Sequence, residues 1–246
     1  MSATIGSVEQ SRESEHRTGL RSLPDATPYV AGRALPLAEH ADLRDPWDGS
    51  AVTRVALSTD ADVRAAIDAA VDAQKSVAAL ATHERAAILR RAADLVTDRA
   101  DQYAVNITRQ TGKARKNALR EVRRAAWTMR AAATAAETHI GSAPVADAAP
   151  EHEGVLAVTV WEPIGVVGAI TPFNAPFNLM THKVVPAFAA GNAIVVKPAS
   201  QAPLSALDVA RVLEEAGAPA GAINVVPGNR QRWPPSWTTL AWACTP

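Results

Sequence analysis

The chain has 246 residues, which is enough for one large domain or two small ones, and its 48% hydrophobic content is ordinary for a globular protein. Lys plus Arg and Asp plus Glu both total 25, so bulk charge favours neither a nucleic acid nor a membrane surface as a partner. The single cysteine, Cys244, excludes an internal disulfide, and no secretory leader or membrane-spanning run is evident. We therefore predict a cytoplasmic protein.

The first half of the chain is predicted to be mainly helical. After a flexible amino-terminal segment over residues 1–40, the alternation in AVTRVAL favours a strand over 51–57, and Thr59 can cap a helix. The apolar face of that helix is predicted to contain Val63, Ile67, Ala70, Val71, Val77 and Ala78.

Two more helices are predicted before residue 140. One runs without interruption from about His83 to Thr111-Gly112, and its buried side contains Ile88, Leu89, Ala92, Val96, Tyr103 and Ile107. In the next helix the apolar residues from Leu119 to Ile140 are spaced alternately three and four apart, and Gly141 ends it. This regular stripe predicts helix-on-helix packing in a core.

The second half of the chain changes to an α/β pattern. A polar connector over 141–153 and a strand, VLAVTVWEP, are predicted to lead up to residue 163. Over 164–228 the apolar runs IGVVGAI, NAIVVKP and INVVPG alternate with two helical segments, which predicts a βαβαβ unit with strands buried on both faces. Ligands of such parallel sheets bind beyond the carboxyl ends of the strands, where PFNAPFN and KPAS both lie.

Two side chains at these strand ends are candidates for chemistry. Pro172 and Pro176 stiffen the first loop, so the amide of Asn174 could be held where it stabilises an oxyanion; alternatively, it bonds only its own turn. Lys197 ends the second buried strand and could donate to ribose hydroxyls or phosphate; alternatively, its stem lies on the sheet edge and its head reaches water. The usual G-x-G-x-x-G dinucleotide fingerprint is absent here.

Three motifs in register resemble the aldehyde dehydrogenase superfamily. They are EPIGVVGAITPFNAPFN, HKVVPAFAAGNAIVVKPASQAPLSA and AGAPAGAINVVPG, and TGKARKNALREVRRAAWTMR is similar to the same family's amino-terminal region. The resemblance runs from about residue 40 to Gly228. It implies an incomplete Rossmann-like cofactor domain over 41–228, an aldehyde substrate, NAD or NADP as cofactor, and a homo-oligomer in the family.

The resemblance also implies roles for individual residues. Asn174 would donate to the oxyanion of a thiohemiacetal, and Lys197 would bond the adenosine ribose. Ser200 stands where many members carry a glutamate that binds the ribose; because a serine does not repel a 2′-phosphate, NADP is slightly favoured over NAD. The nicotinamide end of the cofactor would be lined by the backbone of Ile170, Thr171, Pro172 and Phe173. No metal site is expected.

The resemblance ends where residues 229–246 begin. This tail, NRQRWPPSWTTLAWACTP, is interpreted as a shifted reading frame or, alternatively, as a genuine divergent end. The family's general-base glutamate and nucleophilic cysteine are expected further on, and no glutamate follows Glu215 in this sequence. Cys244 is a poor candidate for the nucleophile because no motif surrounds it that would activate a thiol.

Three functional hypotheses therefore stand. The first is a truncated aldehyde dehydrogenase, inactive by itself because the catalytic domain is absent. The second is a non-catalytic nucleotide-binding module that holds the cofactor and pairs with intact subunits. The third is an interaction protein that uses its long helices.

Overall fold

The fold is a mixed α/β structure built around a five-stranded sheet. The computed structural model describes residues 23–139 and 141–228. Predictions for residues 1–22, for Ile140 and for the tail over 229–246 lie outside these ranges. The main sheet has the strand order β2-β1-β7-β6-β5, and a separate two-stranded sheet pairs β3 with β4.

Three neighbouring strands of the main sheet run parallel, as predicted. They are β5 (Val166–Ile170), β6 (Ala193–Lys197) and β7 (Ile223–Val225), joined through helices α6 (Pro176–Ala189) and α7 (Pro203–Glu215). Two short strands, β1 (Tyr29–Val30) and β2 (Arg33–Ala34), extend the sheet antiparallel beyond β7. The small sheet contains β3 (His40–Arg44) and β4 (Ala51–Ala56).

The period of two along β6 separates the two cores that flank the sheet. Ile194 and Val196 belong to the larger apolar cluster, which also contains α6 and α7 residues. Ala193 and Val195 belong to a smaller cluster with Val63 and Ala70 of the first helix. Every residue of β6 is buried, as expected of a central strand with side chains pointing alternately to two covered faces.

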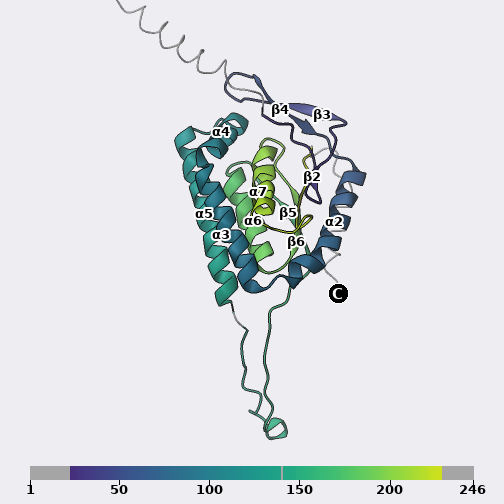
Figure 1. The fold of residues 1–246 in the computed structure, drawn as a ribbon, viewed down its shortest axis with the longest axis vertical. Helices are drawn as coiled ribbons and strands as arrows, with labels where there is room; N and C mark the ends of the chain where they lie inside the picture. Colours follow the sequence, from purple (N-terminus) through teal and green to yellow (C-terminus); the bar gives the residue numbers. More distant parts are fainter. Residues whose placement is uncertain (1–22, 140, 229–246) are drawn as a thin grey trace, which may run out of the picture.

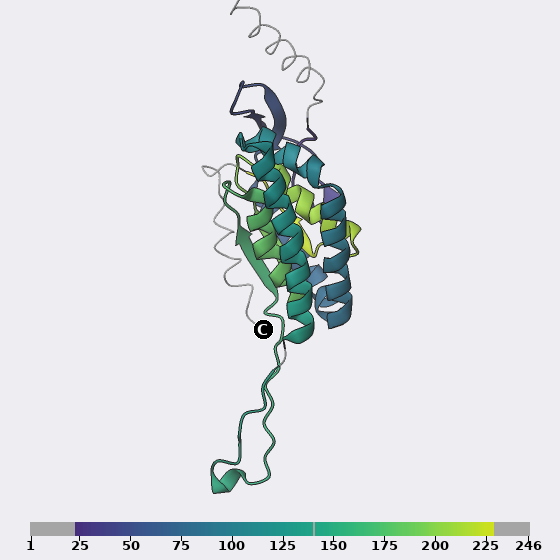
Figure 2. The ribbon, with the colours of Figure 1, turned by 90° about the vertical axis from the view of Figure 1, so that its left-hand side faces the viewer.

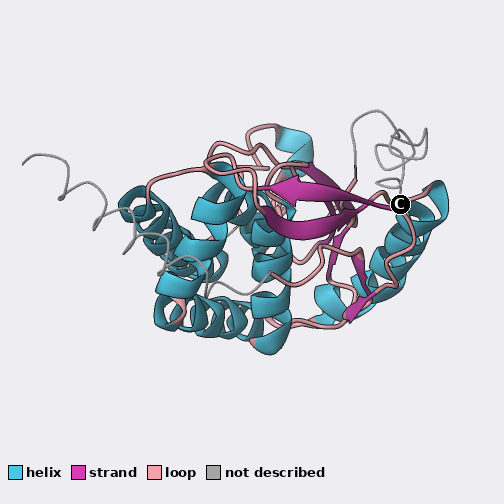
Figure 3. Cartoon of the chain, turned by 90° about the horizontal axis from the view of Figure 1, so that it is seen from above, coloured by secondary structure: helices cyan, strands magenta, loops and turns pink. Residues whose placement is uncertain are grey.

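The helices cover the two faces unequally (Figure 1). Helix α2 (Asp60–Ala79) lies alone on one side of the sheet, whereas α6 and α7 cover the other side and are themselves covered by an outer layer. That layer consists of α3 (Thr82–Asp98), α4 (Ala100–Thr111) and α5 (Arg115–Thr138). Figure 3 shows the strands between these two groups of helices.

Two features of the helices differ from the predictions. The helix predicted from His83 to Thr111 is broken, because Arg99 leaves helical geometry with ψ near 17° between α3 and α4 and its guanidinium pairs with Glu215. The predicted buried Val71 is 49% exposed, since α2 faces only the sheet and buries the single stripe Val63, Ala66, Ala70, Ala73 and Val77. The N-cap at Thr59, with its capping box to Asp62, is as expected.

Residues 141–163 form a long projection that we call the arm (Figures 1 and 2). The strand predicted over VLAVTVWEP is wrong: the backbone there is extended, but no strand is assigned. Its contacts across the arm include the Thr159 N–H to Ser142 carbonyl bond, at 2.8 Å, and side-chain bonds between the same two residues, which do not make a ladder. An extended chain becomes a strand only when a neighbour supplies a ladder of hydrogen bonds.

Two strands also depart from what was expected. β5 was predicted to be buried on both faces, but it is the edge strand of the sheet, and Ile170 is 56% exposed. Residues 23–40 fall within the segment predicted to be flexible, yet they include β1 and β2, and Tyr29 pairs with Val225 of β7. Each of these strands has only two residues, so it is defined by the partner it joins and not by local pattern.

Candidate functional site

The carboxyl ends of β5 and β6 bring the two predicted motifs together. In the parallel register Ile170 lies beside Lys197, the last residue of each strand. The backbone N–H of Thr171 then donates to the carbonyl of Lys197 at 3.0 Å, so the pairing continues into the loop. The loop over 171–175 and the start of the KPAS segment therefore leave the sheet side by side, where parallel sheets place their ligands.

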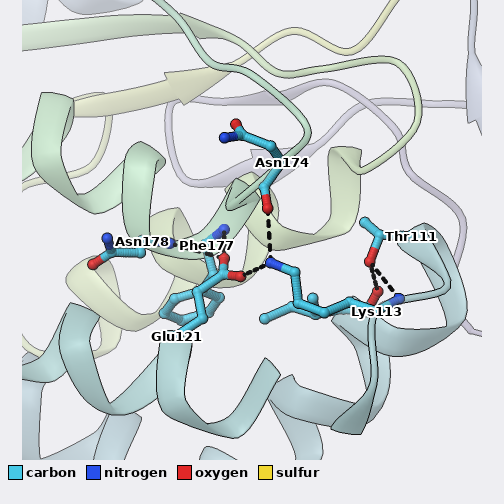
Figure 4. A network of polar contacts seen from close by, with 7 residues as sticks. Thr111, Lys113, Glu121, Asn174, Phe177 and Asn178 are labelled. Carbon is cyan, nitrogen blue, oxygen red and sulfur yellow. Dashed lines mark hydrogen bonds and ion pairs between the residues drawn. The ribbon is translucent and has the colours of Figure 1, made fainter. Parts of the chain in front are cut away.

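The loop over 171–175 presents Asn174 to solvent while the backbone is held. Pro172 and Pro176 fix two φ angles, and α6 begins at Pro176. Asn174 is exposed, and its amide points away from the polar contacts beneath it (Figure 4). Within residues 23–139 and 141–228, its recorded hydrogen bond is made by its main-chain carbonyl and not by the amide. The alternative, an amide bonded to its own turn, therefore has no support here.

Lys197 is a buried cation at the end of the central strand. It is 7% exposed, which does not fit the alternative of a head group reaching into water. Ser200, three residues on, donates its hydroxyl to the carbonyl of Gly228 at 2.8 Å. The serine oxygen can therefore still accept a hydrogen bond, and it carries no charge that would repel a phosphate.

Beneath the loop lies a polar network that sequence reasoning missed (Figure 4). The carboxylate of Glu121 on α5 accepts from the backbone N–H groups of Phe177 and Asn178, at 2.9 and 3.3 Å. Its other oxygen pairs with the ammonium of Lys113, which also donates to the main-chain carbonyl of Asn174 at 2.8 Å. Glu121 is 6% exposed and the Lys113 side chain is 21% exposed, so this is a partly buried ion pair at the first turn of α6.

A signal for this network exists in the sequence. Glu121 lies three residues after the buried Ala118 and eight before the buried Met129, on the side of α5 that faces the core. A charged residue at an apolar position of a helical stripe indicates a buried partner. The identity of the partner does not follow from the sequence, because the contacted amides are 56 and 57 positions away.

Other features of the described residues point to no different site. Within 23–139 and 141–228 no cluster of His, Cys, Asp and Glu could hold a metal, and no helix there is long and apolar enough to cross a bilayer. A cleft of about 510 Å³ lies at the far end of α6, lined by residues such as Thr128, His139 and Trp161. None of the predicted catalytic or cofactor-binding residues lines this cleft.

Comparison with known proteins decides the family. The model of the aldehyde dehydrogenase family matches residues 36–233. The chain belongs to the aldehyde dehydrogenase family. One relative, the 3-sulfolactaldehyde dehydrogenase of Priestia aryabhattai, is 38% identical over 201 residues, which are 82% of this chain and 42% of the relative.

Solved structures of the family share this fold. An NADP dependent enzyme of E. coli superposes with a TM-score of 0.79 at 35% identity, over 84% of this chain and 42% of that one. PnpE in complex with nicotinamide adenine dinucleotide superposes with a TM-score of 0.78 at 35% identity, over 83% of this chain and 42% of that one. The chain thus spans less than half the length of these aldehyde dehydrogenase relatives, and the α/β fold predicted from the sequence is confirmed.

Proposed function

We propose that this chain provides the cofactor-binding part of an NAD(P)-dependent aldehyde dehydrogenase, which converts an aldehyde to a carboxylic acid. The observation that carries the proposal is the register of β5 and β6, which pairs Ile170 with Lys197. Through that pairing, the loop carrying Asn174 and the buried Lys197 share one edge of the sheet. The proposal also rests on family membership.

The residues at this edge fit a nicotinamide dinucleotide by their chemistry. The Lys197 ammonium supplies donors suited to ribose hydroxyls, and Ser200 supplies an acceptor. The exposed side chains of Ile170 and Phe173 supply apolar surface beside the loop backbone. When bound, the cofactor supplies the hydride acceptor. The neutral Ser200 leads us to propose that NADP is accepted, with NAD as the second possibility.

We assign Asn174 the role of oxyanion donor. Its amide is exposed and its backbone is fixed, so little reorganisation is needed when negative charge develops on a carbonyl oxygen placed above the loop. The one cysteine of the sequence, Cys244, lies outside the described residues, and no motif surrounds it that would activate a thiol. We therefore propose that residues 1–246 by themselves bind the cofactor without oxidising the aldehyde.

Cofactor titration tests the proposal. NADP and NAD are titrated into the chain and into Lys197→Ala, with Lys75→Ala on the exposed side of α2 as the matched control. Loss of the Lys197 hydrogen bonds is expected to weaken binding by about 1–3 kcal/mol, while the control keeps the affinity of the parent. Equal affinities in all three proteins would contradict the assigned role.

An absorbance assay addresses the catalytic half of the proposal. Aldehyde and NADP are mixed with the purified 246-residue chain, and formation of reduced cofactor is followed. No aldehyde-dependent increase is expected. An increase that requires both the aldehyde and the chain would show that a nucleophile is present, and Cys244→Ala would then identify it.

A further inference from the structure

The two crossover helices begin in the same unusual way. Neither α6 nor α7 has a side-chain cap of its own, because alanine occupies both N-cap positions, Ala175 and Ala202. In each helix a side chain from the outer helical layer accepts hydrogen bonds from the first turn, and we call such a side chain a borrowed cap. The side-chain oxygen of Gln110 on α4 accepts from the N–H of Leu204 at 2.9 Å, and Glu121 on α5 plays the same part for α6. Two N–H groups of the first turn of α6 and one of the first turn of α7 are thus satisfied by residues remote in sequence.

The two borrowed caps differ in charge. Gln110 is a neutral amide that is 1% exposed, and it satisfies α7 with one hydrogen bond. The cap of α6 is a buried carboxylate with a lysine partner, although burying an ion pair costs free energy that a neutral amide avoids. Helix capping alone therefore does not account for the ion pair, since the neighbouring helix shows that an amide suffices.

The additional contact is made by Lys113. Its ammonium joins the Glu121 carboxylate to the main-chain carbonyl of Asn174, so one network holds the loop on both sides of Pro176. The carbonyl is fixed before the proline and two N–H groups are fixed after it. Because the bonds are charge-assisted, they are stronger and more directional than the neutral bond at α7.

We propose that Glu121 and Lys113 are positioning residues that set the place of the Asn174 amide, beyond any role as a helix cap. This inference rests on the proposed function for the meaning of the Asn174 position. The network acts on the amide through the backbone of residue 174, whose carbonyl accepts from Lys113.

Nuclear magnetic resonance of the cofactor-free chain tests the positioning role. Two signals are followed: hydrogen exchange of the Phe177 and Asn178 amides, and the side-chain amide resonances of Asn174. Glu121→Ala is expected to speed exchange of the two amides about tenfold or more and to shift the Asn174 signals. Lys113→Met is expected to shift the Asn174 signals while the two amides stay protected, because Glu121 still caps the helix.

Gln110→Ala is the matched control, since it removes the other borrowed cap. It is expected to speed exchange of the Leu204 amide and to leave the Asn174 signals in place. Glu121→Gln, which keeps an acceptor but loses the charge, should restore protection of Phe177 and Asn178 and leave the Asn174 signals displaced. If Glu121→Ala does not fold, Lys113→Met decides the question, because the Lys113 side chain is 21% exposed and caps nothing.

Two results would overturn the proposal. One is an unchanged set of Asn174 signals in Lys113→Met. The other is the same displacement in Gln110→Ala, which would indicate a general loosening of the helices. Failure of the proposed function is seen separately: a parent chain that binds neither NADP nor NAD contradicts the cofactor role, whereas the exchange and resonance results require no cofactor.

Discussion

The two ends of helix α5 lead to regions of opposite character. Near its start, Glu121 joins Lys113 and the first turn of α6 in a buried network that holds an exposed loop. After its end the chain leaves the body as the arm, where Leu156 is 83% exposed and Val160 is 72% exposed (Figure 2). The loop is held by hydrogen bonds from beneath, whereas the second half of the arm carries a run of exposed apolar side chains. Exposure therefore has different causes in the two regions.

The loop and the arm differ in the contacts that hold them. The loop over 171–175 obtains its order from within the described chain, through hydrogen bonds to Lys113, just before α5, and to β6. The arm carries alternating apolar side chains that are largely exposed, and Trp161 packs on His139 with ring centroids 4.9 Å apart. Exposed apolar surface of this kind favours contact with another molecule.

The largest expected effect lies at the base of the loop. Phe177 is fully buried and packs on the ring of Tyr103 with centroids 5.1 Å apart. Phe177→Ala should lower the free energy of unfolding by about 3–5 kcal/mol, because a large cavity is left. Chemical denaturation measures the change. Phe173→Ala is the matched control, since that ring is 53% exposed and should contribute less than about 1 kcal/mol; equal losses would show that the loop is not anchored as described.

A second expected effect is a pH dependence of the free energy of unfolding, caused by a carboxyl group in the body of the molecule. Burial raises the pKa of Asp208 on α7 from its ordinary 3.8 to about 6. The hydrogen bond from Asn106 and the charge of Arg211 lower the pKa, but their effect is smaller than that of burial. A raised carboxyl pKa means that the folded state binds the proton more tightly than the unfolded state. Stability is therefore lost as pH rises from about 4 to about 6, and the loss is complete above that range.

Asp208→Asn removes this ionisation while keeping an acceptor for Asn106. The variant should exceed the parent in free energy of unfolding by on the order of 2 kcal/mol at pH 7, and the difference should vanish below about pH 4. Denaturation at several pH values measures it. Asp147→Asn in the exposed arm is the matched control and should change the free energy of unfolding by less than about 0.5 kcal/mol; a difference for Asp208→Asn that does not vary with pH would show that the carboxyl is not desolvated.

The smallest expected effect on stability is in the arm itself. Leu156→Asp together with Val160→Asp should change the free energy of unfolding by less than about 0.5 kcal/mol, because neither side chain is packed. The same change should reduce self-association, measured by light scattering, because it places charge on an apolar edge. A loss above about 1 kcal/mol would contradict the contrast between the arm and the loop.

Local pattern in the sequence was sufficient for much of this molecule. The order of strands and helices over 164–228 followed from three apolar runs that alternate with two helical segments, and from Gly191 with φ near +84°, a value that favours glycine, just after α6. The position of Asn174 and Lys197 at strand ends followed as well, because each motif directly follows its own apolar run. The roles of these two residues stay predictions.

Tertiary contacts alone decided the rest. The edge position of β5, the break at Arg99 and the arm without a strand each depend on which distant segment lies alongside. Glu121 is the clearest case: its own helix shows a charge on an apolar face, but the amides it binds are 56 and 57 residues away. Neighbours along the chain determine helix or strand through backbone geometry, whereas the partner of a buried charge is determined by packing, which joins residues remote in sequence.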